Sequence, residues 1–218
     1  MLDRYYEAFS AIFGLSAIVT RILLCSNRGV LKVSLMGEAP HKLDKTLVLV
    51  RLMGCGKSSV GRRLAARLGV EFVDTDDEIA KAAGMCIPEI FEKFGERGFR
   101  DGEVKVISRL LADEPRIMAT GGGAFMSPLV RAEVERTATS VWLRASLDTL
   151  WARVKGKPGR PLLENDNPKQ VLADLLVERT PIYSMADVVV DTIADNTHET
   201  VVNHILAALA DFERIEEN

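Results

Sequence analysis

The sequence predicts an α/β domain with a parallel sheet, and three observations lead to this fold class. From Thr46 onward, short runs of apolar and β-branched residues alternate with segments in which apolar residues recur at helical spacing. A glycine-rich turn joins the first run directly to a helical segment. Polar or glycine residues follow most of the runs, where a site could form. The 218 residues suit one such domain with an appendage.

Five short runs are candidate strands because each is rich in apolar or β-branched residues. They span 46–50, 71–74, 116–119, 140–143 and 187–190. Helical spacing of apolar residues marks eight further segments. These span 57–68, 76–83, 88–94, 100–112, 128–136, 147–154, 168–184 and 197–212. The first helix is amphipathic, with Val60 and Leu64 on one side and Arg63 and Arg67 on the other.

The first 44 residues differ from the rest of the chain. Residues 8–20 are mostly apolar, but Arg21 follows and the run is short for a membrane span. Asp3 and Glu7 argue against a secretory signal, and a transit peptide is the less favoured alternative. We expect residues 1–44 to be a loosely attached extension, or sequence upstream of a true start at Met36, and the domain to span 45–214.

Composition narrows the function classes. A net charge of −3 argues against binding to nucleic acid or to a membrane surface, which a basic excess usually accompanies. The three cysteines, Cys25, Cys55 and Cys86, are an odd number without a C-x-x-C pair. They predict a reducing, cytoplasmic setting and neither a disulfide framework nor a zinc site.

Residues 51–58, here called the phosphate loop, read Arg-Leu-Met-Gly-Cys-Gly-Lys-Ser. They match the pattern G-x-x-x-x-G-K-[ST] except at Arg51, where glycine is expected. Backbone N–H groups at the start of a helix form an anion site, and the helix dipole adds positive charge. Lys57 would reach the terminal phosphates of a nucleotide, and the Ser58 hydroxyl would hold Mg²⁺. An ordinary glycine-rich turn does not explain why lysine and serine follow the last glycine.

An acidic cluster follows the second predicted strand. Asp74 and Asp76 are two residues apart, so they would share a face in extended geometry. One could steady the hydration shell of Mg²⁺, which suits Asp74, while the other accepts a hydroxyl proton. Asp77 and Glu78 are interpreted as acids of the first helical turn.

Two arginines are candidates for a carboxylate clamp. Arg100 precedes Glu103 by three residues, which is commonly just an ion pair on a helix surface. A guanidinium is also the natural clamp for a substrate carboxylate, and Arg179 could supply its other half. Residues 121–123, here called the glycine triplet, place bare backbone after the third strand.

Residues 155–167, here called the lid, contain two glycines and two prolines and cannot hold a regular element. Their basic start and the apolar Leu162 and Leu163 suit a mobile flap over an anionic ligand. A plain surface loop is the alternative. Arg153 before the lid and Arg160 within it are placed to close on phosphates and nucleotide.

Taken together, these residues resemble the shikimate kinase family over about residues 45–210. The resemblance runs from the phosphate loop through 72–76 and is then carried by Gly95, Glu96, Phe99, Arg100, Glu103, the glycine triplet, 160–163, Arg179, Pro181, Tyr183, Ala186 and Asp187. It implies a three-layer P-loop kinase fold, with a five-stranded parallel sheet flanked by helices and a mobile lid. It also implies transfer of the γ-phosphoryl group of ATP to the 3-hydroxyl of shikimate, on the route to chorismate and the aromatic amino acids. We expect a monomer.

The resemblance implies roles for individual residues. Asp76 binds the ring hydroxyls and acts as base, Arg100 and Arg179 grip the shikimate carboxylate, and Glu103 orients Arg100. Gly121, Gly122 and Gly123 line the same pocket. The nucleotide and Mg²⁺ residues are Met53, Gly54, Cys55, Gly56, Lys57, Ser58, Ser59, Arg153 beside the adenine, Arg160 on the transferring phosphate, and Asp74, which supports the metal through water. Lys57, Asp76 and Arg160 are the expected catalytic residues.

Arg51 is the departure from the family pattern. Its side chain could strain the phosphate loop, intrude near the phosphates or point outward. One alternative is therefore a non-catalytic or impaired P-loop protein with a nucleotide-binding or regulatory role. Gluconate kinase and nucleoside monophosphate kinase are rivals with the same fold, but Asp76 and the paired arginines suit a hydroxylated ring acid better.

Overall fold

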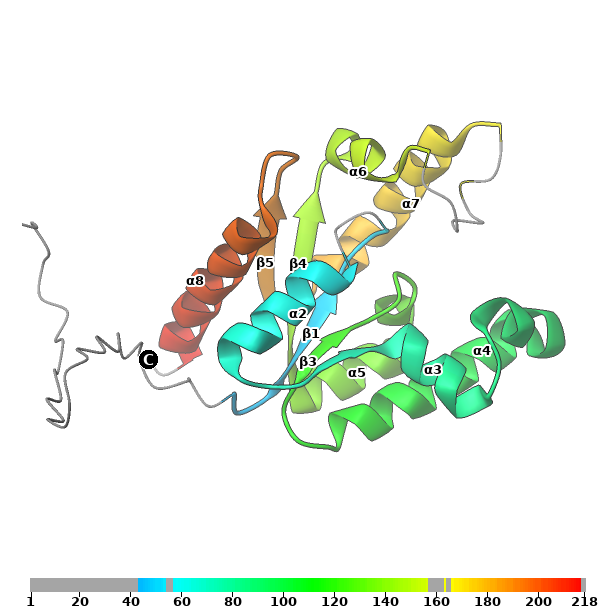
Figure 1. Cartoon of the computed structure of the whole chain (residues 1–218), viewed down its shortest axis with the longest axis horizontal. Helices are drawn as coiled ribbons and strands as arrows, with labels where there is room; N and C mark the ends of the chain where they lie inside the picture. The colour runs from blue at the N-terminus through cyan, green and yellow to red at the C-terminus, as the bar shows by residue number, and fades with distance from the viewer. Residues whose placement is uncertain (1–42, 54–56, 157–162, 164–165, 217–218) are drawn as a thin grey trace, which may run out of the picture. The chain divides into compact units, whose positions relative to one another are not determined.

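A computed structural model describes residues 43–53, 57–156, 163 and 166–216 (Figure 1). The N-terminal extension, the centre of the phosphate loop and most of the lid lie outside these residues. Among the residues described, no helix is long and apolar enough to cross a membrane.

The sheet has five parallel strands, as the sequence predicts, in the order β2-β3-β1-β4-β5. The strands are β1 (Thr46–Val50), β2 (Phe72–Asp74), β3 (Ile117–Ala119), β4 (Ala138–Ala145) and β5 (Val188–Thr192). Every predicted boundary lies within two residues of the observed one. The central strand β1 is buried along its whole length, whereas the edge strand β5 alternates buried and exposed residues. The central position of β1 therefore explains why four of the five residues at 46–50 are apolar and all five are buried.

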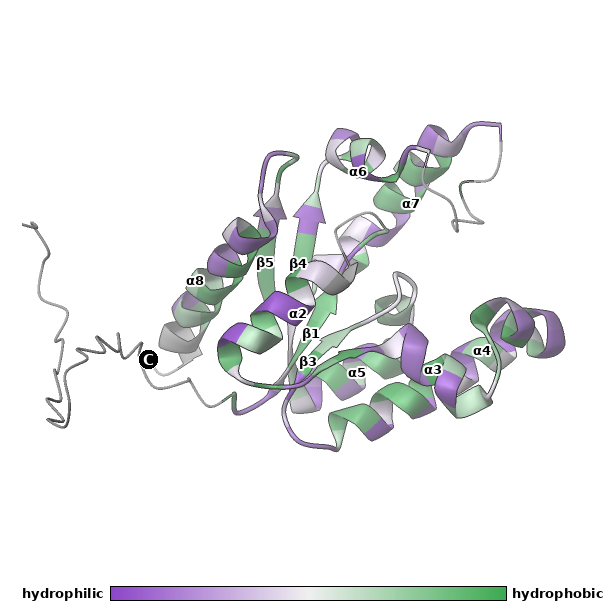
Figure 2. Cartoon of the chain, viewed as in Figure 1, coloured by the Kyte–Doolittle hydropathy of each residue, from purple (hydrophilic) through white to green (hydrophobic). Residues whose placement is uncertain are grey.

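Helices cover both faces of the sheet and make three layers (Figure 1). They are α2 (Lys57–Leu68), α3 (Thr75–Ala83), α4 (Ile87–Leu111), α5 (Pro128–Thr137), α6 (Leu147–Val154), α7 (Pro168–Tyr183) and α8 (His198–Glu216), with a 3₁₀ turn η1 (Ala124–Met126). Leu47 and Leu49 of β1 pack with α2 and α8, and Val48 and Val50 pack with the helices of the other layer. Figure 2 shows the strands as the apolar centre between these layers. The alternation of side chains along β1 thus supplies both cores.

Helix α4 joins two segments that the sequence predicts as separate helices, 88–94 and 100–112. Only Gly95 departs from helical geometry, with φ 68° and ψ −178°, so the expected gap is a kink at one residue. Phe91 and Phe99 stack across this kink with ring centroids 4.4 Å apart. The predicted break is correct in place, but it is much shorter than expected, because this aromatic contact holds the two halves together.

Replacing Gly95 by alanine is expected to lower the free energy of unfolding by about 1–3 kcal/mol, because its φ and ψ lie in a region that only glycine adopts easily. Gly102 in the same helix is the matched control. A Cβ there meets no atom within 4 Å, so Gly102→Ala should be neutral or stabilise by roughly 0.5–1 kcal/mol. Urea denaturation measures both variants, and equal stabilities would contradict the prediction.

Candidate active site

The first strand runs into the phosphate loop as the sequence predicts. β1 ends at Val50 and α2 begins at Lys57, so the loop opens a helix at the carboxyl end of the central strand. Met53 is half-buried and packs against the core, and the carbonyl of Ser59 accepts a hydrogen bond from Arg63 Nη1 (3.1 Å). Gly54, Cys55 and Gly56, and the side chains of Lys57 and Ser58, lie outside the described residues.

Arg51 is enclosed by the protein. Only 2% of the residue is exposed, which excludes the outward-pointing arrangement considered above. Its carbonyl oxygen accepts a hydrogen bond from the Tyr183 hydroxyl at 3.4 Å. The first position of the phosphate loop, where the motif expects glycine, is therefore occupied by an arginine whose side chain is buried.

The acidic cluster differs from the extended arrangement that the sequence suggests. Asp74 ends β2 and is the N-cap of α3, and its Oδ1 accepts a hydrogen bond from the Asp76 N–H at 3.2 Å. Helix α3 begins at Thr75, one residue earlier than predicted, so Asp76 lies in its first turn. The expectation that Asp74 and Asp76 share the face of a strand is wrong, because the cap starts the helix between them. The cap nevertheless keeps the two residues adjacent.

The glycine triplet brings three predicted site residues together from three helices. A Cβ added at Gly121 would lie 2.7 Å from Asp76 Oδ1, and one at Gly123 would lie 2.5 Å from Arg100 Nη2. A Cβ at Gly122 would lie 3.0 Å from Arg179 Nη1. The distances at Gly121 and Gly123 are too short for a real Cβ, so side chains there would displace Asp76 and Arg100, whereas a Cβ at Gly122 would crowd Arg179. The absence of side chains at 121–123 thus leaves room for Asp76, Arg100 and Arg179.

Arg100 forms an ion pair with a buried acid, Glu103. Its Nη1 lies 2.8 Å from Glu103 Oε2, and Glu103 is only 1% exposed. The exposed Glu96 lies 3.6 Å from the same guanidinium. The pair of Arg100 and Glu103 is therefore not the surface ion pair that such spacing commonly forms. Burial raises the pKa of Glu103 above its ordinary value, and the hydrogen bond and charge of Arg100 oppose this rise.

Replacing Glu103 by glutamine is expected to change how stability depends on pH. The raised pKa means that the folded protein holds this proton more tightly than the unfolded chain. Its contribution is therefore complete below the ordinary value near 4.5 and is lost as pH rises through the folded-state pKa. We therefore expect the difference in free energy of unfolding, wild type minus Glu103→Gln, to decrease as the pH rises from about 4.5 through the folded-state pKa. Urea unfolding of both proteins at matched pH values tests this, and a constant or rising difference would contradict it.

Arg179 and Tyr183 lie one turn apart on α7 and meet at the glycine triplet. Arg179 Nη1 donates to the Gly122 carbonyl at 2.8 Å, and the Tyr183 hydroxyl donates a short hydrogen bond to the same oxygen. Sequence reasoning assigned Tyr183 no role beyond the resemblance. Its spacing of four residues from Arg179, on the same side of a helix, was the available signal.

Arg153, which precedes the lid, lies away from the glycine triplet. Arg153 Nη2 donates to the Ile193 carbonyl at 2.7 Å, which places it beside the turn that follows β5. Arg160 lies outside the described residues, as does most of the lid. Leu163 is described and packs against the core.

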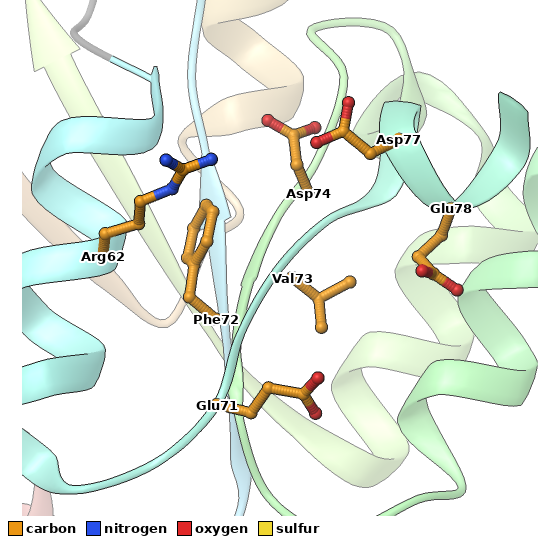
Figure 3. Close-up of a pocket in the computed structure, with 7 residues that line it drawn as sticks. All are labelled: Arg62, Glu71, Phe72, Val73, Asp74, Asp77 and Glu78. Atoms are coloured by element: carbon orange, nitrogen blue, oxygen red, sulfur yellow. The ribbon is translucent and has the colours of Figure 1, made fainter. Parts of the chain in front are cut away.

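A cavity of about 430 Å³ lies beside the edge strand β2 (Figure 3). Asp74 and Asp77 line it, and the guanidinium of Arg62 lies over the Phe72 ring, 5.6 Å from its centroid. None of the residues at the glycine triplet lines this cavity. Within the described part of the chain, no group of three or more His, Cys, Asp or Glu residues could hold a metal by itself.

A phosphate loop after the central parallel strand, with an aspartate and two arginines around a glycine triplet, defines a P-loop kinase of small molecules. The family model described as Shikimate kinase matches residues 53–210. The chain belongs to the shikimate kinase family.

Individual relatives agree with this membership. A shikimate kinase of Paramagnetospirillum magneticum is 46% identical over 175 residues, covering 80% of this chain and 89% of that protein. One from Caulobacter vibrioides is 51% identical over 165 residues, covering 76% and 82%. Among solved structures, the shikimate kinase from Acinetobacter baumannii in complex with shikimate has a TM-score of 0.73 at 36% identity, covering 78% and 95%. A gluconokinase from Sinorhizobium meliloti, with a TM-score of 0.54 and 21% identity, shares the fold alone.

Proposed function

We propose that this chain transfers the γ-phosphoryl group of ATP to the 3-hydroxyl of shikimate, giving ADP and shikimate 3-phosphate on the route to chorismate and the aromatic amino acids. The observation that carries this proposal is the convergence of Asp76, Arg100 and Arg179 on the glycine triplet. One carboxylate and two guanidiniums suit an acceptor that bears hydroxyls and a carboxylate on a ring. Gluconate also has both groups, but the identity to shikimate kinases favours shikimate.

On the acceptor side, Arg100 and Arg179 bind the carboxylate, and the glycine triplet lets the ring approach the backbone. Glu103 holds the Arg100 guanidinium in one orientation through its 2.8 Å contact. Asp76 binds the ring hydroxyls. It takes the proton of the 3-hydroxyl while the oxygen of that hydroxyl forms its bond to the γ-phosphorus. The bond from that phosphorus to the β,γ-bridging oxygen breaks, and ADP leaves.

On the nucleotide side, residues 53–59 bind the phosphates through backbone N–H groups and side chains. Lys57 and Arg160 offset the negative charge that moves during transfer, and Arg153 lies beside the adenine. Ser58 would hold Mg²⁺ directly and Asp74 would hold it through water. When bound, the metal would neutralise negative charge on the phosphates.

A coupled ADP-release assay with shikimate tests the function, run on the native protein and on Arg51→Gly. We expect shikimate-dependent turnover that shows saturation, with shikimate 3-phosphate identified by mass spectrometry. Gluconate serves as the competing acceptor. Absence of shikimate-dependent turnover in both proteins would refute the assignment. Turnover only in Arg51→Gly would show that the buried Arg51 impairs the native phosphate loop and would favour the impaired nucleotide-binding protein.

We further propose that residues 45–214 form the catalytic domain, with 1–44 as an extension, and that the protein acts as a cytoplasmic monomer without nucleic acid or membrane partners. The odd number of cysteines without a C-x-x-C pair supports the cytoplasmic setting, and the net charge of −3 supports the absence of nucleic-acid and membrane-surface partners. Light scattering coupled to size-exclusion chromatography measures the mass of the protein in solution. The mass of a dimer would contradict the proposed monomer.

A further inference from the structure

Tyr183 lies at the site, but it belongs neither to the phosphate loop nor to the carboxylate clamp of Arg100 and Arg179. It ends α7 and is 1% exposed. Its ring packs edge-on against Trp142, with centroids 6.0 Å apart, and against Phe125 at 6.4 Å. Such packing fixes the ring and therefore fixes the position of its hydroxyl group. A buried tyrosine hydroxyl is usually hydrogen-bonded, so its partners show what it holds.

The hydroxyl lies between two backbone carbonyls that belong to the two halves of the site. One is that of Gly122, in the middle of the glycine triplet, which also accepts from Arg179 Nη1. The other is that of Arg51, the first residue after β1 and the start of the phosphate loop, at 3.4 Å. Because the hydroxyl has one hydrogen, the nearer Gly122 carbonyl is its main acceptor and the Arg51 carbonyl shares that hydrogen over the longer distance. In sequence, Tyr183 stands 132 residues from Arg51 and 61 from Gly122. A single side chain thus links the nucleotide loop to the acceptor loop.

We propose that Tyr183 is a positioning residue that sets the glycine triplet in register with the phosphate loop. Phosphoryl transfer depends on the distance and alignment between the attacking oxygen and the γ-phosphorus. Each reactant is held by one of the two loops, so the hydroxyl that joins the loops fixes that alignment. A carbonyl that accepts from both Tyr183 and Arg179 also couples the carboxylate clamp to the same linkage. This inference rests on the proposed function and deepens it.

Tyr183→Phe tests the linkage because it keeps the ring and its packing and removes only the hydroxyl. Misalignment on the scale of an ångström is costly, so we expect kcat with shikimate to fall about 10-fold, with each KM changing less than about 3-fold. The specific readout is the amount of shikimate 3-phosphate formed per ADP released. Misaligned reactants leave the γ-phosphoryl group open to water, so this ratio should fall in the variant.

Trp142→Phe is the matched control, since it trims the packing around Tyr183 and leaves the hydroxyl in place. It should lower stability without lowering the product ratio. Wild-type kcat and product ratio in Tyr183→Phe would overturn the inference, as would an equal loss of ratio in Trp142→Phe. Absence of shikimate phosphorylation in wild type and in Arg51→Gly is a different outcome, because it refutes the proposed function itself.

Discussion

Replacing Asp76 by asparagine is expected to lower kcat for shikimate phosphorylation by about 100-fold to 10,000-fold, the range typical for loss of a general base. The amide keeps the size of the side chain beside Gly121, where the carboxylate now lies. It cannot accept the proton of the 3-hydroxyl. The hydrogen bond that starts α3 involves the backbone N–H of Asp76, so the substitution leaves the helix cap intact. KM for ATP should change little.

Asp77→Asn is the control for this experiment. Asp77 follows in the same helical turn but is exposed and lines the cavity beside β2. It should keep nearly wild-type kcat, which separates loss of the base from loss of a local negative charge. Initial rates at saturating ATP and shikimate measure both variants. Equal activities of Asp76→Asn and wild type would remove Asp76 from the chemistry.

Replacing Arg100 by lysine is expected to lower kcat/KM for shikimate by about 100-fold, because an ammonium group cannot reproduce the hydrogen bonds of the guanidinium to both Glu103 and a carboxylate. Lysine keeps the charge but lacks the planar fork that can serve Glu103 and a carboxylate together. The buried Glu103 would also lose the donor now 2.8 Å away. The loss should appear mainly in KM for shikimate, since carboxylate binding is weakened before and during transfer.

The matched control is Arg109→Lys, which lies further along the same helix. Arg109 pairs with Glu78 at 2.9 Å and its side chain is more than half exposed, so its loss should leave both KM values near wild type. Steady-state kinetics with each substrate varied in turn makes the comparison. If Arg100→Lys raised KM for ATP and left that for shikimate unchanged, Arg100 would belong to the nucleotide site instead.

Local patterns were sufficient to predict the sheet and the strand–loop–helix around the phosphate loop. The apolar run at 46–50 predicted its strand without error because a central parallel strand is buried on both faces. Helix boundaries were also close, since capping residues and prolines mark them locally. The early start of α3 was missed because it depends on the side chain of Asp74 turning back onto the Asp76 N–H.

The sequence by itself determined the family, the parallel sheet and the residue types around the site. Only the tertiary structure decided that Arg51 is enclosed, that Glu103 is a buried partner of Arg100, and that Tyr183 bridges the two loops. Each of these depends on which segments pack together in space. Motif spacing shows which functional groups a segment carries. Burial and hydrogen-bond partners, in contrast, depend on residues up to 132 positions away in the sequence.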